Sequence, residues 1–303
     1  MTIHISQIKV PVDGGIYLEA DLYVPQVLHQ QPLPAISMAN GYAGARKHNI
    51  DKYAEAFAKA GFIVLLHDHR NFGGSEGSVR HDIDPWQQIA DWRRVLTYLE
   101  QEVPNTDPSR LGIWGTSYAG GHVLVLAATD QRVKCVVSQI PTISGYEQML
   151  RRVPVDQWEA FMERLDQDER DELKTGKPTY QAIVSVDPTV PASYRGQVAY
   201  DFYMRHNDDP AYWKNEVTVR STRKAMMYEP GPWVPRIGPT PLLMLVATKD
   251  TLTLTDVELK AYNQAHHPKK LVLFDGGHFD PYVKWFDKTS SQAIQWFQQY
   301  LGN

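Results

Sequence analysis

The sequence predicts an α/β fold in which a mostly parallel central sheet carries helices on both faces. Short, continuous apolar runs recur along the 303 residues and are typical of strands buried on both faces. Stretches with a helical apolar period lie between several of these runs, and strand-helix alternation of this kind favours a parallel sheet. Hydrophobic residues make up 43% of the chain and charged residues 22%, which is ordinary for a globular protein.

The chain opens with a predicted antiparallel hairpin at a sheet edge. Apolar residues alternate from Ile16 to Val24, which is the period of a strand with one buried face, and Gly14-Gly15 precede them as a turn. Six apolar runs after the hairpin are predicted to be buried strands: residues 35–38, 62–66, 111–114, 133–138, 242–247 and 271–274.

Several helices are predicted between these strands. Apolar residues recur at helical spacing over residues 50–58, and Gly61 follows as a stop signal. Asp84 and Pro85 supply an N-cap and a first-turn proline for a helix that runs to Leu99. The apolar run over residues 122–128 predicts a further helix.

Residues 144–237 break the alternation and contain no clear buried strand. They hold a densely charged helix candidate at residues 157–174, closed by Gly176 and Pro178, and the segment is too long for a loop. We therefore expect a helical cap at residues 144–237 inserted into a core of residues 1–143 and 238–303. Four cap aromatics are candidate substrate contacts: Tyr146, Trp158, Tyr203 and Trp213.

The composition excludes several classes of partner and cofactor. A net charge of −4 leaves no basic surplus for binding nucleic acid. The single cysteine, Cys135, lies in an apolar strand and excludes a disulfide framework or a multi-thiolate metal site. Residues 1–9 alternate instead of forming a signal peptide, and no apolar run approaches the roughly 18–20 residues that span a bilayer. We expect a cytoplasmic protein without membrane contact, metal or cofactor; the triplet His67-Asp68-His69 lacks the further ligands of a metal site.

Two serines compete for the position of a nucleophile on a sharp turn between a strand and a helix. The literal Gly-x-Ser-x-Gly match contains Ser75, but no helix start follows it and the preceding strand ends several residues earlier. Ser117 departs from the pattern by one residue, Ala119, yet a short strand precedes it and an apolar helix follows. Since the strained turn is what exposes the serine oxygen above the sheet, we assign Ser117 as the nucleophile.

A serine hydroxyl needs a base and an orienting carboxylate. Asp250 follows the strand at 242–247, and His278 follows the strand at 271–274, which gives the chain order serine, acid, histidine. Asp256 is expected to cap the helix that begins near Val257 instead. The oxyanion would be held by the backbone amide of Tyr118, directly after the serine, and by that of Tyr42 in the loop after the strand at 35–38.

With these motifs, the chain resembles the α/β-hydrolase superfamily over essentially its whole length. Within it, the sequences Asp68–Ser75, Gly115–His122 and Gly276–Phe279 resemble fungal polyketide thiohydrolases and polyketide transferases. Two departures are Asn40, where many relatives have His, and Ala119 in place of the second elbow glycine. The resemblance implies an acyl-enzyme at Ser117 that is released to water or to an alcohol.

We therefore expect a cofactor-independent serine hydrolase that cleaves a small-molecule ester or thioester, either free or carrier-bound. Three alternatives remain open at this point: acyl transfer to an alcohol, hydrolysis of a carbon–carbon bond beside a ketone, and a non-catalytic binding module on the same fold. The sequence does not determine the acyl chain or the oligomeric state.

Overall fold

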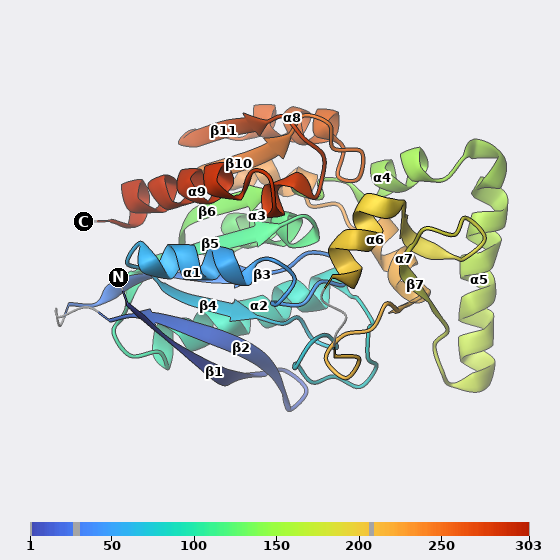
Figure 1. Ribbon diagram of the computed structural model, residues 1–303, viewed down its shortest axis with the longest axis horizontal. Coiled ribbons are helices and arrows are strands. Elements are labelled where there is room, and N and C mark those ends of the chain that lie inside the picture. Colours follow the sequence, from blue (N-terminus) through green and yellow to red (C-terminus); the bar gives the residue numbers. More distant parts are fainter. Residues whose placement is uncertain (1, 27–30, 206–208, 303) are drawn as a thin grey trace.

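An eight-stranded sheet forms the centre of the protein in the computed structural model, which describes residues 2–26, 31–205 and 209–302 (Figure 1). The strand order is β1-β2-β4-β3-β5-β6-β10-β11. β1 and β2 form the predicted edge hairpin, β2 pairs antiparallel with β4, and the remaining pairs are parallel. The strands are β1 (Ile3–Val12), β2 (Ile16–Pro25), β3 (Leu33–Ala39), β4 (Ile63–His67), β5 (Thr106–Thr116), β6 (Val133–Gln139), β10 (Leu242–Ala247) and β11 (Lys269–Phe274).

Helices cover both faces of the sheet, as predicted. α1 (Asp51–Lys59) packs against α9 (Phe286–Leu301) on one face, while α2 (Pro85–Gln101) packs against α3 (Tyr118–Thr129) on the other. α8 (Thr255–Gln264) and the short η3 (Asp280–Tyr282) lie beside the last strands. The side chain of Asp84 caps α2 by accepting hydrogen bonds from the amides of Trp86 and Gln87.

Aromatic packing joins α1 to the sheet and to α9. The rings of Tyr53 and Trp114 lie 4.9 Å apart, and those of Phe57 and Phe297 lie 5.7 Å apart. All four residues are almost fully buried, and each buried aromatic side chain contributes roughly 1.5–3 kcal/mol through the hydrophobic effect. This packing holds β5, the strand that leads to Ser117, against α1 and α9.

The segment between β6 and β10 gathers at one end of the sheet (Figure 1). Its helices are α4 (Gly145–Arg152), η1 (Val155–Gln157), α5 (Trp158–Thr175), α6 (Gln197–Met204), α7 (Arg220–Met226) and η2 (Gly231–Arg236). It also contains a second sheet of order β8-β7-β9, built from β7 (Tyr180–Ser185), β8 (Ala192–Arg195) and β9 (Val217–Thr218). The expectation of a helical cap without a clear buried strand did not include this small sheet, because none of its strands contains four consecutive apolar residues.

The helix after β10 also differs from the expectation. Leu254 is the N-cap of α8, and Asp256 lies inside its first turn, so Asp256 is not the cap. The exposed Asp256 carboxylate instead forms a two-pronged ion pair with Arg151, at 2.7 Å for each contact.

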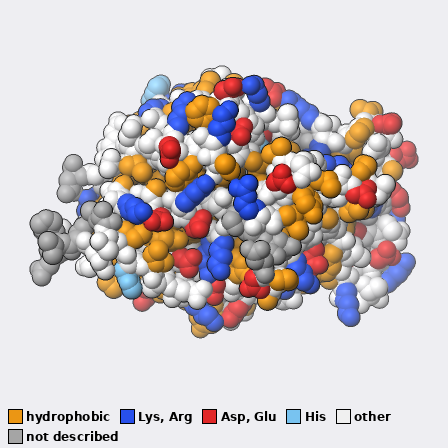
Figure 2. Space-filling model, viewed as in Figure 1, with side chains coloured by type: hydrophobic (Ala, Val, Ile, Leu, Met, Phe, Trp, Pro, Cys, Tyr) orange, Lys and Arg blue, Asp and Glu red, His pale blue; other side chains and the backbone are white. Residues whose placement is uncertain are grey.

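The surface agrees with the balanced composition. Basic and acidic side chains are interspersed with hydrophobic ones over the face seen in Figure 2. Among the residues that the structure describes, no helix is both long and apolar enough to cross a membrane.

Candidate active site

Ser117 occupies a strained turn between β5 and α3. Its backbone has φ 57° and ψ −117°, a conformation that non-glycine residues rarely adopt. The end of β6 holds this turn, because the Ser117 amide donates to the Gln139 carbonyl at 2.9 Å. The Thr142 amide in turn donates to the Ser117 carbonyl, also at 2.9 Å. The strand-turn-helix context predicted for Ser117 is therefore present.

The elbow is so tight that a small residue is needed before the serine. A Cβ atom on Gly115 would lie 2.2 Å from the carbonyl oxygen of Ala119, in the first turn of α3. Backbone atoms cannot move far enough to relieve so close a contact. A glycine at position 115 therefore allows α3 to pack directly against the end of β5, the strand that precedes it.

Three predicted residues meet above the carboxyl ends of β5, β10 and β11. His278 Nε2 lies 2.9 Å from Ser117 Oγ, and His278 Nδ1 lies 2.7 Å from Asp250 Oδ2. An ionised carboxylate only accepts hydrogen bonds, so Nδ1 carries the proton and Nε2 is free to accept from the serine hydroxyl. The arrangement can therefore remove a proton from Ser117 and return it to a leaving group.

Thr253, which no motif of the sequence indicates, completes the surroundings of Asp250. Its amide and that of Leu252 donate to Asp250 Oδ1 at 2.9 and 2.8 Å, and its hydroxyl donates to Oδ2 at 2.8 Å. Burial by itself raises the pKa of Asp250, but the neighbouring His278 and the bonds from Thr253 outweigh it, and the net pKa lies below the usual value. Asp250 thus stays ionised beside the histidine.

The loop after β3 passes directly beside the serine. A Cβ atom on Gly41 would lie 2.9 Å from Ser117 Cβ and 3.3 Å from its Oγ. Asn40 shapes this loop: its side chain donates to the Ala45 carbonyl at 2.8 Å and accepts from the Gly41 amide at 2.8 Å. The Gly41 amide is thereby occupied, and the next amide along the loop is that of Tyr42. Tyr118 is the first residue of α3, where an amide has no partner within the helix.

Two of the four aromatics predicted to contact substrate hold this loop from the cap. The Tyr203 hydroxyl donates to the Tyr42 carbonyl at 2.7 Å, and Trp213 Nε1 donates to the Ala43 carbonyl at 2.8 Å. Both side chains are buried. Trp158 stacks edge-on against Tyr146, at a ring distance of 6.3 Å. Tyr146 is half exposed and lines a separate surface groove between α4 and α8.

A cavity of about 770 Å³ lies between the cap and the catalytic end of the sheet. Tyr42 and Tyr118 form part of its wall, and so do Thr251 and Leu252, which follow Asp250. Among the described residues, none of Tyr146, Trp158, Tyr203 and Trp213 belongs to that wall. Met149, Phe161 and Tyr194 are the larger apolar side chains that do.

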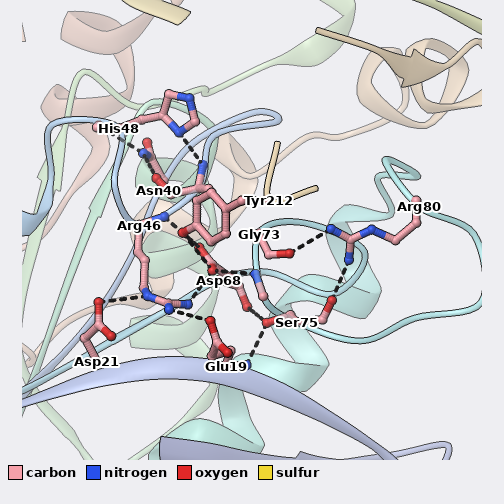
Figure 3. A network of polar contacts seen from close by, with 12 residues as sticks. Glu19, Asp21, Asn40, Arg46, His48, Asp68, Gly73, Ser75, Arg80 and Tyr212 are labelled. Atoms are coloured by element: carbon pink, nitrogen blue, oxygen red, sulfur yellow. Dashed lines mark hydrogen bonds and ion pairs between the residues drawn. The ribbon is translucent and has the colours of Figure 1, made fainter. Parts of the chain in front are cut away.

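Ser75, the rival serine, lies in a different environment (Figure 3). It is 1% exposed, its hydroxyl donates to the Asp68 carbonyl at 2.7 Å, and it accepts from the Glu19 amide at 2.8 Å. The serine therefore ties the glycine-rich loop to β2 and has no contact with His278.

Arg46 is the centre of the surrounding ion-pair network (Figure 3). Its buried guanidinium contacts the carboxylates of Glu19, Asp21 and Asp68 at 2.5, 2.8 and 2.5 Å. Asp68 also accepts from the Arg46 amide at 2.6 Å and from the Tyr212 hydroxyl at 3.0 Å. The network fixes the loop that contains Gly41 and Tyr42 to the sheet and to the cap.

Three buried histidines lie below this loop. His69 Nε2 contacts the Asn40 carbonyl at 3.0 Å, and its ring lies 5.2 Å from His67 and 5.5 Å from His122. Burial lowers the pKa of all three, that of His69 to about 4, so they are neutral at pH 7. Among the described residues, no three His, Cys, Asp or Glu side chains are grouped to hold a metal ion.

Gly41→Ala should lower turnover of an activated ester by about tenfold to a thousandfold, because the new methyl group would displace Ser117 from His278. Steady-state kinetics will measure this. Gly61→Ala, where φ is 103° and no atom lies within 4 Å of the new Cβ, is a control for backbone strain away from the serine: it should lose stability and keep its turnover. Unchanged turnover in Gly41→Ala would contradict the contact between this loop and the serine.

The mostly parallel sheet, the helices on both faces and the serine turn after β5 define an α/β hydrolase. The family model of the X-Pro dipeptidyl-peptidases (S15 family) matches residues 13–280, and the chain belongs to this family. It is an enzyme of the α/β-hydrolase class.

Curated relatives support the predicted resemblance. The chain is 31% identical to the quorum-quenching protein AidA of Acinetobacter baumannii, over 95% of this chain and 93% of that protein. It is 28% identical to the thiohydrolase aneE of Aspergillus aculeatus, over 89% and 85%. It is 23% identical to the polyketide transferase claH of Penicillium crustosum, over 95% of each chain.

Solved structures share the whole fold. A structure of DcsB in complex with its substrate analogue superposes with a TM-score of 0.86 at 21% identity, covering 99% of this chain and 100% of that one. The α/β hydrolase GrgF from Penicillium sp. superposes with a TM-score of 0.84 at 22% identity and the same coverage. The predicted fold class is confirmed.

Proposed function

We propose that this protein is a serine hydrolase that cleaves an ester or thioester through an acyl-enzyme at Ser117. The observation that carries the proposal is the chain of contacts from Ser117 Oγ to His278 Nε2 and from His278 Nδ1 to Asp250. These residues adjoin a cavity whose wall includes Tyr42, Tyr118, Thr251 and Leu252. The relatives named thiohydrolase and polyketide transferase support an acyl-transfer chemistry of this kind.

In the first half-reaction, Ser117 Oγ attacks the carbonyl carbon while His278 Nε2 takes the hydroxyl proton. The negative charge moves to the carbonyl oxygen, where the amides of Tyr42 and Tyr118 donate hydrogen bonds to it. The carbon–oxygen or carbon–sulfur bond to the leaving group then breaks, and the leaving group takes the proton from His278.

In the second half-reaction, water loses a proton to His278 and attacks the acyl-enzyme, which releases the carboxylic acid and restores Ser117. Asp250 stabilises the imidazolium in both steps. Tyr203 and Trp213 are positioning residues in this scheme, since they hold the carbonyls of the loop that presents the Tyr42 amide.

An alcohol in place of water would give acyl transfer by the same residues. The relative named polyketide transferase is the observation that favours this second function. A product assay in the presence of a competing alcohol separates the two, because transfer yields a new ester and hydrolysis yields the free acid.

Labelling with a fluorophosphonate tests the proposed nucleophile. We expect the probe to add once per chain, on the peptide that contains Ser117, and a p-nitrophenyl ester or a thioester to protect against it. Peptide mass spectrometry will locate the adduct. Labelling at Ser75, or none at all, would contradict the mechanism and favour a non-catalytic binding module. Labelled enzyme that turns over no ester or thioester would point to carbon–carbon cleavage.

A further inference from the structure

The charged side chains in the wall of the catalytic cavity are all basic. Arg152 comes from the end of α4, Arg164 from α5 and Arg195 from the end of β8. Among the described residues of the wall, no Asp or Glu accompanies them. This concentration of positive charge is unexpected in a chain of net charge −4.

These arginines make only neutral hydrogen bonds within the described part of the protein. Nη1 of Arg152 donates to the Ser193 carbonyl at 3.2 Å, and Nη1 of Arg164 donates to the Gln181 side chain at 2.8 Å. Nη1 of Arg195 donates to the Pro188 carbonyl at 2.9 Å. A guanidinium has five N–H donors, and in each case the neutral contact uses a single nitrogen.

Nearby arginines outside the cavity are paired with acids. Arg151, the neighbour of Arg152 in α4, forms its ion pair with Asp256, and Arg170, one helix face away from Arg164 in α5, pairs with Glu163 at 2.6 Å. The cap therefore contains acids that pair with surface arginines, whereas none of the three cavity arginines forms an ion pair among the described residues. Arg164 also borders a neighbouring groove that contains Asp168.

Arg152 and Arg164 are partly buried and supported by aromatic rings. The Arg152 guanidinium lies 4.9 Å from the centre of the Tyr194 ring, and that of Arg164 lies 6.0 Å from the Phe161 ring. Burial lowers the pKa of Arg164, the negative charge of Asp168 raises it, and the positive charge of Arg195 lowers it further. Partly buried charges of one sign cost free energy until an opposite charge reaches them.

The positive charge lies close to the reacting end of the cavity. Burial raises the pKa of Tyr42 to about 12, and among the groups that oppose this rise is the charge of Arg152. The same charge acts on Tyr194, another residue of the wall. The contacts agree with this position: Arg152 Nη1 donates to the Ser193 carbonyl at 3.2 Å, and the Ser193 hydroxyl lies 3.5 Å from the Tyr42 hydroxyl.

We infer that Arg152 and Arg164 bind an anionic group of the substrate, a carboxylate or a phosphate, at the cap side of the cavity. This inference rests on the proposed function, because it specifies the substrate of the same site. The anion has two sources with shared chemistry: a carboxylate at the far end of the acyl chain, or a phosphate of a carrier in the leaving group. An arginine guanidinium can bind either group, because two of its N–H donors match two oxygens of a carboxylate or a phosphate.

Matched thioesters test the inference and separate the two sources. The neutral reference is the pentanoyl thioester of pantetheine. Its glutaryl counterpart carries a carboxylate in place of the terminal methyl group of the acyl chain, and pentanoyl-4′-phosphopantetheine adds only a phosphate to the leaving group. We expect kcat/KM to rise at least about tenfold for one of the two anionic compounds, as for a hydrogen bond to a charged group.

Arg152→Gln and Arg164→Gln should each remove about tenfold or more of that preference, measured as the ratio of kcat/KM for the anionic thioester to kcat/KM for the neutral one. Arg151→Gln is the matched control, since it lies on the same helix outside the cavity and should preserve the preference. Melting curves will show that each variant is folded. Equal kcat/KM for all three thioesters, or a preference that survives in both cavity variants, would overturn the inference.

A binding measurement tests the arginine site without relying on turnover of the substrate. Calorimetric titration of Ser117→Ala with the same compounds should give at least about tenfold tighter binding of one anionic compound, lost on adding Arg164→Gln. Turnover of the neutral thioester without any anion preference would sustain the hydrolase and overturn the arginine site. Anion-selective binding without turnover by the unaltered enzyme would support the arginine site and overturn the hydrolase.

Discussion

Ser117→Ala is expected to lower kcat for an ester or thioester by about 10⁴- to 10⁶-fold while the protein remains folded. The reason is that the hydroxyl lies 2.9 Å from His278 Nε2, and no other described side chain places a hydroxyl in contact with that nitrogen. The measurement is steady-state kinetics with a p-nitrophenyl ester, accompanied by thermal unfolding of the variant.

Ser75→Ala is the matched control, because Ser75 is the serine of the literal sequence motif. It should keep turnover within a few-fold and instead lose roughly 1–3 kcal/mol of stability, since the Glu19 amide loses its acceptor. A large kinetic loss in Ser75→Ala with a small one in Ser117→Ala would reverse the assignment of the nucleophile.

Asp250→Asn has the second-largest expected effect, a loss of about 10⁴-fold in kcat. The amides of Leu252 and Thr253 donate to Oδ1, so an asparagine would keep its oxygen there and turn its NH₂ group toward His278 Nδ1. The histidine would then carry its proton on Nε2 and could no longer accept one from Ser117.

The same kinetic assay on Asp256→Asn provides the control. Asp256 is a nearby acid, but it lies on the surface in an ion pair with Arg151, and exposed pairs contribute about 1 kcal/mol or less. Its turnover should match that of the unaltered enzyme. If Asp250→Asn were equally active, the carboxylate would have no part in catalysis.

The local pattern of the sequence was sufficient to predict the sheet, most of the helices and the positions of Ser117, Asp250 and His278. Apolar runs indicate strands because both faces of a parallel sheet are buried. The carboxyl ends of such strands meet at one edge, so residues placed just after β5, β10 and β11 had to come together. The distances of 2.9 and 2.7 Å agree with that expectation.

The cap did not follow from sequence in the same way. Its second sheet consists of short strands, and the role of an aromatic residue there depends on which side of an element faces the core. Tyr203 and Trp213 were predicted to contact substrate, yet their polar atoms hold the loop of Tyr42. Thr253 likewise acquires its contact with Asp250 only through the turn that precedes α8.

The sequence by itself therefore determined the fold class and the three side chains, Ser117, Asp250 and His278, that come together at the sheet edge, because both depend on periodicity and on order along the chain. Only the tertiary structure decided that Ser75 serves the loop around Arg46, and that Arg152 and Arg164 face the cavity while Arg151 and Arg170 face acids. The reason is physical. Whether a side chain in an irregular segment is buried or exposed depends on contacts between elements that are far apart in the sequence, and no local sequence pattern records those contacts.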